Sequence, residues 1–291
     1  MAPPSPPVAV SVVMSVLNSE RTVGAALAST RAQTFPDWEF IVRDDGSRDD
    51  TAHIVAAADD SRIKLLRGEA TLGIAARLNH GIALARGRYI ARMDGDDIAY
   101  PERLERQFAH IEAHRDVDLV GSAAMVFSGL VNAIGVYRIA ERHEDICARP
   151  EVGFALAHPT WFGRREWFGD TPYRESVYRA EDQDLLLRRH KHSRFANLSD
   201  VLLDYRQERL RARHILFGRW HYTRALLAFA RQSGDPLLAV RGVGLQAARG
   251  AVKPALIGIG QDPAVLARRF RAPEPGELAR WLVVRDGARG E

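Results

Sequence analysis

VAVSVVMSVLNSERTVGAALASTRAQTFPDWEFIVRDDGS, residues 8–47, has the pattern of a strand, a helix and a second strand. Its first ten residues are β-branched and apolar on both faces, which is typical of a strand inside a parallel sheet. Apolar residues then recur at helical spacing, at Val23, Ala26 and Leu27, until a Phe-Pro-Asp segment ends the helix. The last ten residues predict a strand that runs into a turn. Such a strand–helix–strand unit predicts parallel pairing.

The same alternation continues along the next part of the chain. Helix, strand, helix and strand are predicted in turn at 51–60, 62–68, 74–86 and 88–93. We therefore expect an α/β fold in which a Rossmann-like, mostly parallel sheet is flanked by helices. In such sheets, ligands bind at the carboxyl ends of the strands.

After the fourth predicted strand the pattern becomes irregular. Residues 118–127 are strand-like, residues 156–168 are rich in aromatic side chains, and residues 178–190 predict a loop that enters a helix. Beyond Arg206 the sequence is basic, helical and amphipathic, so we expect a C-terminal helical appendage. Residues 1–7 include four prolines and predict a flexible, extended leader.

The composition is that of an ordinary soluble globular protein, with 291 residues, 46% hydrophobic and 27% charged. Cys147 is the only cysteine, so an internal disulfide is excluded. The sequence lacks signal-peptide features and any apolar run of ~20 residues, so we expect a cytoplasmic protein. The net charge of +4 fits either a solvated basic surface or a surface for anionic partners. Nucleic acid is not expected, because zinc-finger spacing, RNP-like runs and basic zippers are absent from the sequence.

Two acidic turns follow predicted strands, Asp44-Asp45-Gly46-Ser47 and Asp94-Gly95-Asp96-Asp97. Both fit ordinary turns, because Asp and Gly favour turns. Carboxylates one residue apart also converge on Mg²⁺ or Mn²⁺, which keep coordination positions for phosphate oxygens. Ile98 and Ala99 stand where an EF-hand needs a polar residue and a glycine, which excludes that loop. A cation would cancel the repulsion in the second turn and let a nucleotide diphosphate approach. Glycine-rich phosphate loops, zinc-ligand spacing and the G-x-S-x-G elbow are absent from the sequence.

An ordered set of motifs resembles glycosyltransferase family 2, whose members have the GT-A fold. The motifs are an opening strand that ends at Asn18, DDGS at 44–47, GIAARLNHGI at 73–82, DGDD at 94–97, HPTWFGR at 158–164, EDQDL at 181–185 and LDYRQE at 203–208. The resemblance implies a GT-A domain at 8–208, with a nucleotide-binding half at 8–120 and an acceptor-binding half at 121–208. The leader at 1–7 would precede this domain, and the helical region at 209–291 would follow it.

The resemblance also implies roles for the residues of the nucleotide-binding half. Asp44 and Asp45 would contact the base and the ribose of the nucleotide. Asp94 and Asp96 would hold Mn²⁺ or Mg²⁺, with Asp96 as the direct ligand. Arg77 would lie near the diphosphate, although the family pattern A-R-N reads A-R-L-N here.

In the acceptor-binding half, the resemblance implies that Asp182 is the general base and that Glu181 is its neighbour. Two acids at a helix start also favour the helix dipole, so this pair fits a structural role as well. His158 and Trp161 are expected on the acceptor side. A histidine before proline and an aromatic residue in a loop also fit ordinary core packing.

The implied reaction is an inverting, metal-dependent transfer of one sugar from a nucleotide-diphosphate sugar, expected to be UDP-linked. The acceptor would be a glycan or a lipid-linked sugar in bacterial cell-surface polysaccharide synthesis. Processive synthases of the family carry Q-x-x-R-W, whereas Leu216 replaces that glutamine before Arg219 and Trp220. Addition of single sugars is therefore expected.

Two other functional classes stay open from the sequence. A nucleotide-sugar nucleotidyltransferase also uses carboxylate-held Mg²⁺, but it needs a glycine- and arginine-rich loop where this chain has VLNSER at 16–21. A noncatalytic nucleotide- or glycan-binding protein on the same scaffold is the other class. The C-terminal helices either pack on the catalytic domain or on a second copy in a homodimer, or they contact anionic lipid at the inner face of the plasma membrane.

Overall fold

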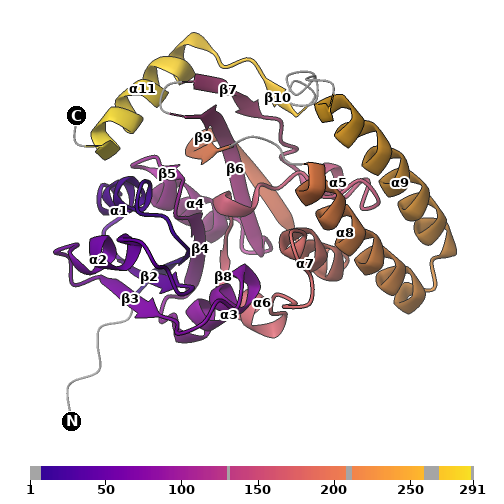
Figure 1. The fold of residues 1–291 in the computed structure, drawn as a ribbon, viewed down its shortest axis with the longest axis horizontal. Helices are drawn as coiled ribbons and strands as arrows, with labels where there is room; N and C mark the ends of the chain where they lie inside the picture. Colours follow the sequence, from indigo (N-terminus) through magenta and orange to yellow (C-terminus); the bar gives the residue numbers. More distant parts are fainter. Residues whose placement is uncertain (1–7, 130–131, 208–211, 259–268, 290–291) are drawn as a thin grey trace.

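The computed structural model of the protein describes residues 8–129, 132–207, 212–258 and 269–289 (Figure 1). The predicted alternation of strands and helices is confirmed in the first part of the chain. Its elements are β1 (Val10–Val16), α1 (Val23–Arg31), β2 (Trp38–Asp44), α2 (Thr51–Ala56), β3 (Ile63–Arg67), α3 (Ile74–Leu84) and β4 (Tyr89–Asp94). Strand β1 is buried on both faces, because Val10, Val12 and Met14 enter one apolar cluster while Val13 enters another.

The first four strands form the parallel half of the sheet. Strand β1 lies between β2 and β4, and β3 pairs with the outer side of β2. The register sets Val16 opposite Asp44 and Ser15 opposite Asp94. Both acidic turns therefore lie at the same carboxyl edge of the sheet, as the sequence predicts.

The second part of the chain completes the sheet. Its elements are β5 (Ile98–Ala99), α4 (Arg103–Ala113), β6 (Leu119–Ser128), β7 (Asn132–Tyr137), α5 (His143–Ile146), the 3₁₀ turn η1 (His158–Thr160), β8 (Phe162–Arg164), α6 (Arg165–Asp170), α7 (Glu181–Arg189) and β9 (Phe195–Arg206). Strand β8 runs antiparallel between β4 and β6 and joins the two halves.

The sheet as a whole is mixed, while the expected parallel pairing holds for its first four strands. Four of its strand pairings are parallel and five are antiparallel among the residues described. Among the described residues no helix lies between β6 and β7, so these two strands form an antiparallel hairpin rather than a parallel pair. The three-residue strand β8 lies inside the aromatic segment whose sequence carries no alternating pattern.

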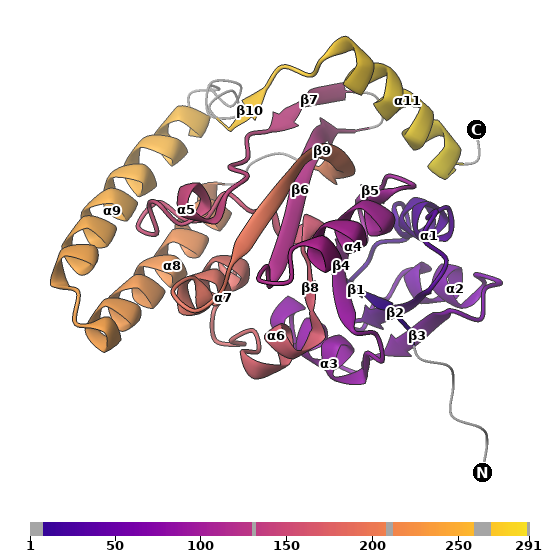
Figure 2. The same ribbon diagram turned by 180° about the vertical axis from the view of Figure 1, so that it is seen from behind.

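The C-terminal part contains α8 (Ala212–Ser233), α9 (Pro236–Gly258), β10 (Phe270–Arg271) and α11 (Pro275–Arg289). The predicted helices are confirmed. Helices α8 and α9 form a hairpin that packs on α7, and α11 crosses the opposite side of the molecule beside α1 (Figures 1 and 2). Strand β10 was not expected; it extends the sheet beside β7. Within the described residues, no helix has the length and apolar character needed to cross a membrane.

Candidate active site

The second acidic turn forms a compact group of three carboxylates. Oxygens of Asp94, Asp96 and Asp97 all lie within 4.8 Å of one another. The sequence singled out Asp94 and Asp96, but Asp97 also belongs to the group and is buried. Its Oδ1 accepts the backbone N–H of Arg206 at 2.9 Å, while its buried Oδ2 has no hydrogen-bond partner. The adjacent acid in the D-G-D-D motif was the signal that could have identified it.

This group fits a divalent cation. Burial, together with the charge of Asp94, raises the pKa of Asp96 to about 6. Burial and the charges of Asp96 and Asp94 raise the pKa of Asp97 well above its usual range. Three carboxylates, of which Asp97 has an orphaned buried oxygen, form a donor set that hard cations such as Mg²⁺ and Mn²⁺ prefer. A bound cation would oppose both pKa shifts by stabilising the ionised carboxylates.

Arg92 provides positive charge beneath this group. Its Nη1 donates to Asp94 Oδ2 at 2.7 Å, and its Nη2 donates to Asp94 Oδ1. The Arg92 side chain is almost fully buried, whereas the Asp94 side chain is 26% exposed. The sequence analysis did not identify Arg92, although a lone arginine in an otherwise apolar strand is a visible signal.

The first acidic turn is tied to the segment that precedes α3. The carboxylate of Asp45 accepts the backbone N–H groups of Leu72 at 2.8 Å and Gly73 at 2.9 Å. It also accepts Arg77 Nε at 2.5 Å, and both of these side chains are buried. Gly68 leaves the space for this arginine, because a Cβ at residue 68 would lie 2.1 Å from Arg77 Nη2. The structure therefore brings Arg77 against Asp45.

Asp44 lies beside this pair but faces different partners. Its Oδ1 accepts the backbone N–H of Ser47 at 3.0 Å, which closes the turn. Its Oδ2 is buried without a hydrogen bond and lies 3.5 Å from Arg67 Nε in an ion pair. This carboxylate is fully buried, whereas Arg67 is largely exposed.

Glu181 and Asp182 occupy the first turn of α7, as the sequence predicts. Burial raises the pKa of both carboxyl groups, and the positive charge of Arg92 acts in the opposite direction on each. Asp182 remains partly exposed and accepts Gln183 Nε2 at 3.1 Å. A partly exposed carboxyl with a raised pKa is suited to proton transfer. The third acid of this turn, Asp184, is instead buried in ion pairs with Arg174 and Arg188.

His158 and Trp161 lie in an aromatic cluster behind the site. His158 Nε2 and Tyr173 Oη are 2.8 Å apart, and burial with the charge of Arg92 lowers the pKa of His158 well below its usual range. Trp161 is fully buried and its Nε1 donates to the carbonyl of Leu156 at 3.2 Å. Its ring is therefore part of the core and is not available to stack on a sugar. The sequence did not single out Tyr173. The side-chain amide of Asn79 holds its backbone, because Asn79 Nδ2 donates to the Tyr173 carbonyl and Asn79 Oδ1 accepts the Tyr173 N–H.

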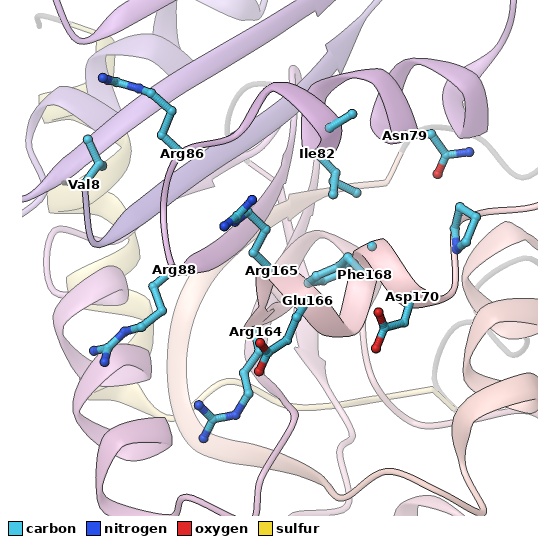
Figure 3. A pocket seen from close by; sticks show the side chains of 13 residues that line it. Val8, Asn79, Ile82, Arg86, Arg88, Arg164, Arg165, Glu166, Phe168 and Asp170 are labelled. Atoms are coloured by element: carbon cyan, nitrogen blue, oxygen red, sulfur yellow. The ribbon is translucent and has the colours of Figure 1, made fainter. Parts of the chain in front are cut away.

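A separate cavity of about 620 Å³ lies near the amino-terminal ends of β1 and β4, away from the acidic group (Figure 3). Four arginines and two carboxylates line it: Arg86, Arg88, Arg164, Arg165, Glu166 and Asp170. Two of these arginines are already engaged, because Arg86 pairs with Glu39 and Arg88 with Glu112. The cavity is therefore close to balanced in charge.

Comparison with known proteins identifies the family of this chain. The model of the family described as Glycosyl transferase family 2 matches residues 11–171. The putative glycosyltransferase EpsE of Bacillus subtilis is 44% identical over 121 residues, which are 40% of this chain and 44% of that protein. WfgD of Escherichia coli, a UDP-Glc:alpha-D-GlcNAc-diphosphoundecaprenol beta-1,3-glucosyltransferase, is 42% identical over 100 residues, 34% of this chain and 40% of that protein. The matches thus span less than half the length of these two relatives.

Two solved structures share the fold at low sequence identity. Staphylococcus aureus TarS 1-349 in complex with UDP has a TM-score of 0.64 at 18% identity, over 97% of this chain and 80% of that one. The mannosyltransferase PcManGT of Pyrobaculum calidifontis, in complex with GDP-Man and Mn²⁺, has a TM-score of 0.59 at 17% identity. The match covers 96% of this chain and 84% of that one. The family model covers more than half of the chain. The chain therefore belongs to glycosyltransferase family 2 and has the GT-A fold.

Proposed function

We propose that this protein transfers single sugars, with inversion, from a UDP-linked donor to a glycan or lipid-linked acceptor in cell-surface polysaccharide synthesis. The observation that carries the proposal is the group of Asp94, Asp96 and Asp97 at the edge that also bears the Asp44-Asp45 turn. A cation site beside a nucleotide site is what a diphosphate donor requires. The division into a nucleotide-binding half at 8–120 and an acceptor-binding half at 121–208 stays a prediction.

We propose Mn²⁺ or Mg²⁺ as the cofactor. Asp96 and Asp97 would hold the cation, and Asp94 would contribute a third carboxylate oxygen. When bound, the cation would neutralise negative charge that develops on the leaving diphosphate. At the other turn, Asp45 and Arg77 form one unit, so a nucleotide that reaches one of them also meets the other. This supports a role for Asp45 at the base and ribose end and for Arg77 beside it near the diphosphate, with Asp44 fixing the turn that carries Asp45.

We propose Asp182 as the general base that removes the proton from the acceptor hydroxyl. Its raised pKa makes it a better proton acceptor than an ordinary aspartate, and its partial exposure leaves it open to the acceptor. Glu181 adds negative charge beside it, while the positive charge of Arg92 opposes the rise in the pKa of both carboxyl groups. His158 and Tyr173 would shape the wall behind the acceptor, without contacting the reacting atoms.

The proposed donor and acceptor follow the activities of relatives and the ligands of structural neighbours. WfgD uses UDP-Glc and a diphosphoundecaprenol-linked sugar, and a TarS structure contains UDP-GlcNAc. ExoO of Rhizobium meliloti, a succinoglycan biosynthesis protein, is 38% identical over 104 residues. These activities support a lipid-linked acceptor. We propose that the protein meets this acceptor at the inner face of the plasma membrane through its basic C-terminal helices.

Calorimetry of nucleotide binding tests the proposal. UDP, GDP, dTDP and CMP are titrated with and without Mn²⁺ into wild type and Asp96→Asn. We expect UDP to bind only with Mn²⁺, and Asp96→Asn to weaken UDP binding at least tenfold. Lack of binding by all four nucleotides would support the noncatalytic reading. Release of pyrophosphate from UTP and a sugar phosphate would support the nucleotidyltransferase reading.

A further inference from the structure

An exposed cluster of aromatic and aliphatic side chains lies beside the start of α7. We define it as the aromatic patch: Tyr178, Leu216, Phe217 and Trp220. Their exposed fractions are 49%, 47%, 53% and 62% in that order. We propose that this patch docks the enzyme on an anionic phospholipid bilayer and so presents the site to a lipid-linked acceptor. This inference rests on the proposed function.

The patch is assembled from two segments rather than scattered. The ring of Tyr178, in the loop before α7, meets the ring of Phe217 on α8 edge-on, with centroids 5.9 Å apart. Trp220 follows one helical turn after Phe217 on the same side of α8. Contiguous exposed aromatic surface is uncommon on a monomeric protein and marks an interaction site. Tyr and Trp rings, apolar with a polar tip, favour the boundary between lipid and water.

The charge around the patch specifies an anionic partner. Residues 212–258 contain seven Lys or Arg residues and a single carboxylate, Asp235. The whole chain has a net charge of only +4, so its positive charge is concentrated in the α8–α9 hairpin. Arg213 and Arg224 are exposed on the side of α8 that carries Trp220, and the guanidinium of Arg179 lies 5.3 Å from the ring centre of Tyr178. Basic side chains around aromatic anchors match an anionic bilayer surface.

The position of the patch links it to the proposed acceptor site. Helix α8 touches the loop before α7 closely, because a Cβ at Gly218 would lie 2.8 Å from the carbonyl oxygen of Arg179. Helix α7 begins at Glu181, and Asp182 follows Arg179 by three residues. Tyr222 is buried on α8, one turn after Gly218. Burial raises its pKa, and the negative charge of Asp182 raises it further. A bilayer against the patch would therefore place the diphosphate of a lipid-linked acceptor beside α7.

Vesicle flotation tests the docking surface on the full chain. The vesicles contain phosphatidylcholine alone or with phosphatidylglycerol. The test variant is Phe217→Ser/Trp220→Ser. The matched control is Leu237→Ser/Val240→Ser, which removes equally exposed apolar groups at the other end of the hairpin, where these side chains are 64% and 72% exposed. We expect wild type and the control to float with phosphatidylglycerol vesicles, and the test variant to lose about tenfold or more in binding.

Several outcomes would overturn the docking proposal. The first is that wild type does not float with anionic vesicles. The second is that the patch variant floats as well as wild type, and the third is that the control variant loses as much vesicle binding as the patch variant. A dimer that dissociates in the patch variant, without vesicle binding by wild type, would assign the patch to a second copy instead. Calorimetry with UDP and Mn²⁺ separates this from failure of the proposed function, because the patch variant should bind UDP within about twofold of wild type. UDP binding without vesicle binding leaves the proposed function standing and removes only the docking surface.

Discussion

Arg92 and Asp94 lie two residues apart on one face of β4 and form a two-pronged ion pair that engages both carboxylate oxygens of Asp94. The pair offsets part of the repulsion among three neighbouring carboxylates. It also occupies the oxygens with which Asp94 would bind a cation. Arg92 and the cation therefore compete for the same carboxylate.

The first prediction concerns this competition. Arg92→Met should bind Mn²⁺ at least about tenfold more tightly than wild type without nucleotide, because a competing positive charge is removed. Arg92→Lys should gain less, because it keeps the charge but loses one of the two hydrogen bonds. Electron paramagnetic resonance of free Mn²⁺ measures both. The gain in Mn²⁺ affinity should vanish when Asp94→Asn is combined with Arg92→Met. If folded Arg92→Met binds Mn²⁺ more weakly than wild type, Arg92 instead orients Asp94 for the metal.

A second prediction separates two acids of α7. Asp182→Asn should lower kcat by about 10²–10⁴-fold while UDP binding and thermal stability stay close to wild type, because the change removes a proton acceptor. Asp184→Asn should instead lower the melting temperature, because it breaks a buried pair with Arg188 at 2.9 Å. Steady-state kinetics and thermal unfolding measure the two effects. Near wild-type kcat in Asp182→Asn would remove this residue as the base.

The rate of transfer should also depend on pH through Asp182. A general base acts only when it is ionised, and burial raises the pKa of this carboxyl above its usual value. The kcat should therefore rise with pH on a limb displaced upward from that of an ordinary aspartate. The pH profile of kcat measures the limb at saturating acceptor. If the residual activity of Asp182→Asn lacks this limb, Asp182 is the group whose ionisation produces it.

Glu39 gives a prediction about stability. Burial favours its protonated form, but hydrogen bonds from the backbone N–H of Arg86 and from the Lys64 and Ser11 side chains outweigh this and lower the pKa from 4.5 to about 2. Because the folded pKa is the lower one, the stabilisation is fully present above the unfolded value and is lost as pH falls from about 4.5 to about 2. It amounts to about 3 kcal/mol at pH 7. Urea unfolding of Glu39→Gln at pH 7 should show a loss of this order. The difference from wild type should disappear near pH 2.

A fifth prediction uses the contact between Gly68 and Arg77. In Gly68→Ala the new methyl group would overlap the guanidinium and push it away from Asp45. The side chain can move, so the melting temperature should change little, while UDP affinity should fall about tenfold if the Asp45–Arg77 unit borders the nucleotide. Gly169→Ala is the matched control, because a Cβ there meets no atom within 4 Å. Unchanged UDP affinity in Gly68→Ala would remove Arg77 from the nucleotide site.

The sequence by itself determined the order of strands and helices up to β4, because helical spacing and apolar runs are local patterns. It also determined that both acidic turns share one edge, since parallel strands end together. It placed Glu181 and Asp182 at a helix start for the same local reason. These features depend on residues that are neighbours along the chain.

Only the tertiary structure decided the partners of these groups. Asp45 meets Arg77 across 32 residues, and Asn79 holds Tyr173 across 94. The burial of Trp161, the orphaned oxygen of Asp97 and the pairing of β8 and β10 also depend on segments far apart in the sequence. Such contacts follow from how layers pack, and packing joins residues that no local period relates. The sequence motifs thus indicated which residue types the site contains, while the fold set the partners and the charge balance of those residues.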